Sequence, residues 1–189
     1  MSRAPAPGEG CLLRCFVAVP LSDSARRLVA AALPNALPGR KVPPPNWHFT
    51  IRFLGEIDPA RAGQIADAIA ATTLPPSFGA TLSGLGAFPA VVRARTLWLG
   101  LGRGADQFVR LAAVVNLALE SAGVAGELRP FSPHLTLARL DRPADLSRLI
   151  DDHRASPVSF LVDAIVLFRS DLGDGPPRYT ELGRFPLHA

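Results

Sequence analysis

The sequence predicts a mixed α/β (α+β) fold made of two related lobes. Three observations lead to this prediction. Segments with strand period and segments with helix period alternate along the chain. The pattern HFTIRFLGE, which begins at His48, recurs as HLTLARLDR from His134. The length of 189 residues, 48% of them hydrophobic, favours one compact domain over several.

The first segments are a tail, a strand and a helix. Residues 1–10 are mostly Pro, Gly and Ala with little to bury, so we expect a mobile tail, with the domain covering 11–189. The apolar run at 14–19 predicts a buried strand. Ser22 is placed to cap a helix that ends at about Leu33, before Pro34. The proline-rich stretch 37–45 predicts an irregular surface loop.

A strand of alternating character follows, and then a helix. Phe49, Ile51 and Phe53 alternate with His48, Thr50 and Arg52. Strand period therefore predicts one apolar face and one face that carries His, Thr and Arg. The Asp58-Pro59 pair opens a helix that we expect to end near Thr73.

The second half repeats this order. Strands are expected at 78–85 and 96–101, with Trp98 in the core. The helix at 105–122 is the best defined, because its apolar residues recur at helical spacing and Gly123 ends it. After HLTLARLDR we expect a helix over 143–153 that starts with Pro143, one strand over 158–168 and a last strand over 178–185.

Composition suggests an anionic partner without proving one. The net charge is +4, the pI is about 10.0, and Lys41 is the only basic residue that is not Arg. Arg suits phosphate, although genome composition alone can also produce this usage. Cys11 and Cys15 have no second pair for a structural zinc site. The apolar run near the start is too short for a membrane span, so we expect a cytoplasmic protein.

The repeated pattern supplies the candidate chemistry. Residues i and i+2 of a strand share a face, so His48 with Thr50, and His134 with Thr136, each present an imidazole and a hydroxyl together. A single His on such a strand more often has a structural role. A His-x-Thr pair that occurs twice, on strands that face one cleft, instead indicates a functional site. Two histidines can take a proton from an attacking oxygen and give one to a leaving oxygen. The threonine hydroxyls can donate hydrogen bonds to phosphate oxygens.

Two arginines are candidates for a further phosphate contact. Arg52 shares a face with Thr50 by alternation, whereas Arg139 would face away from His134 unless the strand bulges. Trp47 either stacks on a base or packs inside. His153 and His188 lie outside the motifs and are expected to be exposed.

WHFTIRFLGE and SPHLTLAR resemble the paired H-x-T-x motifs of the two-histidine phosphoesterase superfamily, in its LigT-like RNA 2′,3′-cyclic phosphodiesterase branch. RCFVAVPL and RTLWLGL resemble two further strands of that branch, so the resemblance covers about 14–187. It implies a bilobal fold with pseudo-two-fold symmetry, in which mostly antiparallel sheets and outer helices surround a cleft.

The resemblance also implies a reaction. The expected activity opens a terminal 2′,3′-cyclic phosphate to a 2′-phosphate, with 2′,5′ RNA ligation as the reverse reaction. His48 would be the proton donor and His134 the proton acceptor, while Thr50, Thr136 and Arg139 would hold the phosphate. RNA 3′ ends, including tRNA fragments, or nucleoside 2′,3′-cyclic phosphates would be the substrates of a monomer that needs no metal and no cofactor.

Three other functions remain open. A related two-histidine enzyme could act on 2′,5′-linked oligonucleotides, an ADP-ribose cyclic phosphate or RNA 3′ ends. A non-catalytic nucleotide-binding or RNA-binding module would keep the fold, but we would expect it to have lost part of the motif set. A His-based metal site would need carboxylates close to the motifs, and neither motif has one at close spacing.

Overall fold

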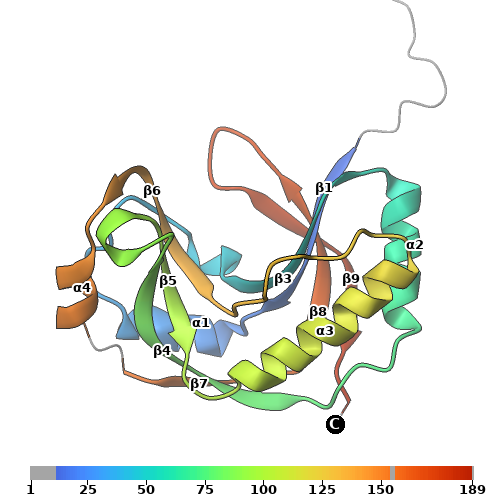
Figure 1. Cartoon of the computed structure of the whole chain (residues 1–189), viewed down its shortest axis with the longest axis horizontal. Coiled ribbons are helices and arrows are strands. Elements are labelled where there is room, and N and C mark those ends of the chain that lie inside the picture. The colour runs from blue at the N-terminus through green and yellow to red at the C-terminus, as the bar shows by residue number, and fades with distance from the viewer. Residues whose placement is uncertain (1–11, 154–155, 189) are drawn as a thin grey trace, which may run out of the picture.

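Two antiparallel sheets form the frame of the molecule (Figure 1). The computed structural model describes residues 12–153 and 156–188, so the expected tail at 1–10 and Cys11 lie outside the described residues. The first sheet has the strand order β3-β1-β8-β9. These strands are β1 (Leu13–Pro20), β3 (His48–Ile57), β8 (Ala164–Asp171) and β9 (Arg178–Pro186).

The second sheet has the strand order β2-β6-β5-β4-β7. Its strands are β2 (Arg40–Lys41), β4 (Phe78–Phe88), β5 (Ala94–Leu101), β6 (Leu135–Ala144) and β7 (Val158–Val162). Every paired neighbour in both sheets is antiparallel. The expected α/β fold with two lobes is thereby confirmed.

Helices pack on the outside of these sheets. They are α1 (Asp23–Ala32), α2 (Pro59–Ala70), α3 (Ala105–Ser121) and the short α4 (Ser147–Asp152), with 3₁₀ turns η1 (Pro44–Asn46) and η2 (Val91–Arg93). The predicted caps are confirmed, because Ser22 Oγ accepts from Ala25 N–H and Asp58 Oδ1 accepts from Arg61 N–H. In α3 the expected apolar stripe is fully buried, and α2 packs against α3.

The two sheets repeat one arrangement. Each motif strand pairs with the strand that precedes it in the same sheet, and the segment between the two contains a helix: α1 between β1 and β3, and α3 between β5 and β6. β3 and β6 contact one another, so the two motif strands meet where the sheets come together. The resemblance of the two motifs in sequence therefore corresponds to equivalent positions in the fold.

Three expectations about local structure are wrong. The loop at 37–45 contains the two-residue strand β2, which pairs with β6, and the turn η1. Pro143 does not open a helix but lies in β6. The helix begins only at Ser147, whose N–H donates to Asp145 Oδ1. The strand expected over 158–168 is two strands in different sheets, separated by Asp163.

Two groups of buried side chains fill the interior. The larger one joins residues from both sheets and from α1, α2 and α3. The smaller one lies on the opposite face of the first sheet and consists of Phe16, Ala18, Val166 and Phe168, with Tyr179 packed against it. Among the described residues, no helix is long and apolar enough to cross a membrane.

Candidate active site

His48 is fixed by two hydrogen bonds at the start of β3. Its Nδ1 lies 2.8 Å from the carbonyl oxygen of Asn46, and its Nε2 lies 3.1 Å from Thr50 Oγ1. Because a carbonyl oxygen can only accept, Nδ1 must carry a hydrogen. In the neutral ring Nε2 is then the acceptor, and Thr50 donates to it.

His134 repeats this geometry in the second sheet. It directly precedes β6, and its Nδ1 lies 2.8 Å from the carbonyl oxygen of Ser132, two residues earlier, as Asn46 is two residues before His48. The same tautomer follows, with Nε2 free to accept a proton. The fold thus presents two imidazoles with the same orientation relative to their own strands.

Both motif strands contain a β-bulge at the third residue after the histidine. In β3, Thr50 lies opposite Ala18 while Arg52 lies opposite Val17, so Ile51 is the extra residue. In β6, Thr136 lies opposite Trp98 while Ala138 lies opposite Leu97, which makes Leu137 the extra residue. A bulge reverses the face on which later side chains lie, so simple alternation fails beyond both threonines.

The bulge in β6 brings Arg139 to the face that carries Thr136. Arg139 lies opposite Thr96, which shares a face with Trp98 and therefore with Thr136. Its charge lowers the pKa values of His48, His134 and Tyr179. The structure therefore places Arg139 at the candidate site, which strict alternation does not predict.

The bulge in β3 has the opposite effect on Arg52. This residue lies opposite Val17 of the larger core, and its guanidinium donates to the Ala125 carbonyl and lies 3.9 Å from Glu127. The expectation that Arg52 shares a face with Thr50 is therefore wrong. Phe53, expected on the apolar face with Phe49 and Ile51, lies opposite Phe16 and is 62% exposed.

Burial and neighbouring charges keep both imidazoles neutral. Desolvation is the main cause that lowers the pKa of His48 from 6.5 to about 4, and the charges of Arg139 and His134 lower it further, against the hydrogen bond to Asn46. The pKa of His134 is also lowered, by burial and then by Arg139, although the Ser132 carbonyl opposes this. Both histidines are therefore proton acceptors at neutral pH until an anion enters the site.

Aromatic rings surround each histidine, and no sequence pattern predicted most of these contacts. Tyr179 meets His48 edge-on at 5.3 Å between ring centroids, and Phe16 lies 4.8 Å from the same ring. Phe88 meets His134 edge-on at 5.0 Å, and Trp98 lies 6.2 Å away. Residues brought in by distant strands carry no local pattern.

Both tryptophans have positions that the sequence left open or assigned incorrectly. Trp98 was expected in the core, yet it is half-buried beside His134, and its Nε1 is buried without a partner among the described residues. Trp47 is 4% exposed and its Nε1 donates to the Val42 carbonyl, which favours packing over free stacking on a base.

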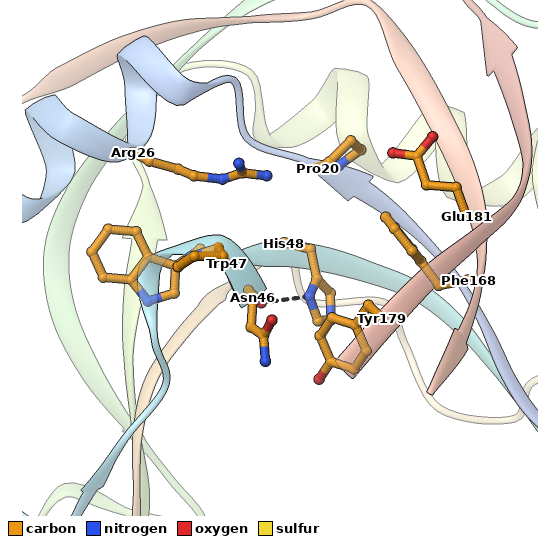
Figure 2. Close-up of a pocket in the computed structure, with 9 residues that line it drawn as sticks. Pro20, Arg26, Asn46, Trp47, His48, Phe168, Tyr179 and Glu181 are labelled. Carbon is orange, nitrogen blue, oxygen red and sulfur yellow. Dashed lines mark hydrogen bonds between the residues drawn. The ribbon is translucent and has the colours of Figure 1, made fainter. Parts of the chain in front are cut away.

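A cavity of about 220 Å³ opens beside His48 (Figure 2). Its lining combines apolar rings with Arg26 from α1 and Glu181 from β9. Asn46 also lines it, and Asn46 Nδ2 donates to the Pro177 carbonyl, which ties the turn before His48 to the start of β9.

The other side chains that could bind a metal ion lie outside this site. His153 is half-buried rather than exposed, and its Nε2 contacts the Ala32 carbonyl, whereas His188 is exposed as expected. Within 12–153 and 156–188, no group of three His, Cys, Asp or Glu side chains could hold a metal ion. Cys15 is a buried free thiol whose pKa is raised by burial.

These features define a class of protein with two antiparallel sheets, each of which contributes one His-x-Thr strand to a common site. The 2′-5′ RNA ligase superfamily model matches residues 11–174, and the chain belongs to this family.

Named relatives agree with this assignment. The chain is 33% identical over 192 residues to the RNA 2′,3′-cyclic phosphodiesterase of Thermus thermophilus, covering 93% of this chain and 90% of the relative. It is 36% identical over 116 residues to the enzyme of that name from Aeropyrum pernix, covering 61% of this chain and 65% of the relative. It spans 56% of the length of the Geobacillus stearothermophilus relative.

Solved structures share the architecture. Escherichia coli LigT, crystallised with 3′-AMP, superimposes with a TM-score of 0.77 at 28% identity, covering 93% of this chain and 98% of LigT. A Thermus thermophilus structure gives a TM-score of 0.73 at 31% identity, with 93% and 98% covered. The two-lobed arrangement implied by the motifs is thus found in known members.

Proposed function

We propose that this chain hydrolyses the 2′,3′-cyclic phosphate at the 3′ end of RNA to a 2′-phosphate without a metal ion. The observation that carries this proposal is the doubled imidazole geometry: His48 and His134 each give Nδ1–H to a carbonyl oxygen and keep Nε2 for proton transfer. The named activity of the relatives from Thermus and Aeropyrum supports the reaction class.

The proposed reaction is an in-line displacement at phosphorus. His134 Nε2 takes a proton from the attacking water as the new P–O bond forms. The bond from phosphorus to O3′ breaks, and His48 Nε2–H gives a proton to O3′. Once His48 Nε2 carries a proton, Thr50 no longer donates to it, so Thr50 and Thr136 donate to the non-bridging oxygens, and Arg139 offsets their charge. The assignment of donor and acceptor follows the family resemblance.

The low pKa of His48 imposes a condition on this mechanism. A proton donor must be protonated in the complex, but the pKa of His48 is about 4. Binding of an anionic phosphate beside the ring favours the imidazolium and raises the pKa. His48 is thus proposed to gain its proton as the substrate binds, while His134 remains neutral and acts as the base.

The test uses purified protein in EDTA with adenosine 2′,3′-cyclic phosphate and a short RNA that ends in a cyclic phosphate. We expect a 2′-phosphate product, and a loss of about 100-fold to 10,000-fold in kcat for His48→Ala and for His134→Ala. His188→Ala is the matched control, because this histidine is exposed and belongs to neither motif.

Other results would redirect the proposal. A 3′-phosphate product would contradict the assigned leaving group, and activity lost in EDTA but restored by zinc would contradict the metal-free mechanism. Turnover confined to 2′,5′-linked oligonucleotides or to an ADP-ribose cyclic phosphate would indicate a related substrate. Tight binding with no turnover of any of these compounds would identify a binding module.

A further inference from the structure

The cavity of about 220 Å³ beside His48 has no part in the proton transfers described above. Its walls come from the end of β1, from α1, from the turn η1 and from β8 and β9, and His48 forms one side (Figure 2). A group attached to the reacting ribose therefore has a space to occupy next to the catalytic ring.

The walls of this cavity are flat and firmly held. Pro20, Pro45, Trp47 and Tyr179 supply rings to it. Trp47 is fixed by its hydrogen bond to the Val42 carbonyl, and Tyr179 by its edge-on contact with His48. Fixed rings next to polar side chains suit a planar ligand with an apolar face and a polar edge, because little side-chain freedom is lost on binding.

Two side chains of opposite charge reach this space from opposite sides (Figure 2). Arg26 Nη1 donates to Asp23 Oδ1 at 2.7 Å, which holds the guanidinium in place, and Arg26 Nε is buried without a partner among the described residues. Glu181 pairs with Arg184 at 2.7 Å rather than with Arg26. A hydrogen-bond donor and an acceptor therefore face one cavity without contacting each other.

This combination favours a nucleobase over a phosphate. Arg184 donates to both oxygens of Glu181, so Glu181 offers a phosphate only acceptor atoms, and Arg26 is the single cationic side chain among the described residues that line the cavity. The edge of a base instead carries both acceptors and N–H donors, which match Arg26 and Glu181 respectively.

We propose that the cavity beside His48 is a nucleobase subsite, in which Arg26 donates to a ring nitrogen or carbonyl and Glu181 accepts from an amino or imino N–H. This inference rests on the proposed function and names its specificity-determining residues. The base belongs either to the terminal nucleotide, which carries the cyclic phosphate, or to the nucleotide before it.

The experiment compares substrates with and without a base. Steady-state kinetics are measured with the four nucleoside 2′,3′-cyclic phosphates, ribose 2,3-cyclic phosphate, and dinucleotides that end in a cyclic phosphate. Arg26→Ala is compared with Arg27→Ala, which removes an exposed arginine from the neighbouring position of α1. Glu181→Gln keeps the size of the side chain and removes its charge.

We expect Arg26→Ala to raise KM about tenfold for base-containing substrates with little change in kcat, because a base contact is worth about 1–3 kcal/mol. The substrate without a base should be unaffected, and Glu181→Gln should reduce the differences among the four bases. An effect on mononucleotides assigns the subsite to the terminal base. An effect confined to dinucleotides assigns it to the preceding base.

Two results would overturn the inference. The first is that Arg26→Ala does not differ from Arg27→Ala with any substrate. The second is that Arg26→Ala weakens the binding of substrates with and without a base equally, as loss of a phosphate contact would. Calorimetric binding of adenosine 2′-phosphate and ribose 2-phosphate to the same proteins tests the subsite independently of turnover. A wild-type protein inactive on every cyclic phosphate contradicts the proposed function, whereas an active one with an insensitive Arg26 contradicts only the subsite.

Discussion

At the scale of single residues, the surroundings of His48 and His134 decide what each can do. Their Nδ1 atoms bind the carbonyl oxygens of Asn46 and Ser132, so the chemistry is left to Nε2. Both rings are neutral near pH 7 because burial disfavours the imidazolium. The same burial makes the stability of the protein depend on pH.

Stability should fall as the pH is lowered from 6.5 to about 4. In this window the unfolded chain protonates His48 and the folded protein does not, so acid favours the unfolded state. The shift of the pKa from 6.5 to about 4 corresponds to about 3 kcal/mol, and His134 adds to it in the same direction. Urea unfolding at several pH values measures this slope. His48→Gln should make it shallower, and an unchanged slope would show that His48 is not buried as described.

Arg139→Ala should raise the pKa values of both motif histidines, His48 and His134. The guanidinium lowers the pKa of each ring, so its removal makes each ring easier to protonate. We also expect kcat/KM to fall at least tenfold, because a charge-assisted phosphate contact of about 1.5–3 kcal/mol is lost. NMR titration of the imidazole signals and steady-state kinetics provide the two measurements.

Arg52→Ala is the control for that variant. The Arg52 guanidinium binds the segment around Ala125 and Glu127, on the other face of β3. It should leave both histidine pKa values in place and change stability instead. If Arg52→Ala and Arg139→Ala shifted the histidine pKa values equally, the conclusion that the bulges place these arginines on different faces would be wrong.

At the scale of elements, the short strand β2 supports the site through β6. Arg40 lies opposite Arg139, and Gly39, just before β2, has a φ of 73°. A Cβ atom at Gly39 would lie 2.5 Å from the Arg139 carbonyl oxygen. The packing of backbone on backbone at this point therefore requires glycine, for both its conformation and its small size.

Gly39→Ala should lower both stability and activity. The positive φ costs about 1–2 kcal/mol for a side chain, and the clash shifts the backbone that carries Arg139. Gly55→Ala is the matched control, because Gly55 has a φ of 75° and an added Cβ would meet nothing within 4 Å. Thermal unfolding should show a cost for both variants, while kcat/KM should fall only for Gly39→Ala. Equal activity of Gly39→Ala and Gly55→Ala would show that β2 does not support the site.

At the scale of the whole molecule, one buried cluster joins the two sheets. It contains Trp47, beside the first sheet, and Leu97 and Leu99 of the second. Side chains packed into one continuous core lose their contacts together, so the two lobes should unfold as one unit.

The two tryptophans provide a test of this cooperativity. Trp98→Phe leaves Trp47 as the reporter of the first sheet, and Trp47→Phe leaves Trp98 as the reporter of the second. In each variant the fluorescence midpoint in urea should coincide with the midpoint from far-UV circular dichroism. Separate midpoints within either variant would show that one lobe unfolds without the other.

The sequence by itself determined most of the local structure and the centre of the site. Strand period around His48, the cap at Ser22 and the apolar stripe of α3 are local signals, because each depends on residues a few positions apart. The repeated His-x-Thr pattern indicated two equivalent strands, and the family assignment agrees with that interpretation.

The tertiary structure decided how those strands meet and which later side chains face the site. The bulges at Ile51 and Leu137 exist only relative to β1 and β5, so the sequence of one strand could not show that Arg139 shares a face with Thr136 while Arg52 lies on the opposite face from Thr50. Tyr179 contacts His48 from β9, and Arg26 of α1 lines the cavity beside it. Periodicity describes neighbours along one strand, whereas pairing register and the approach of distant segments arise only when the whole chain packs.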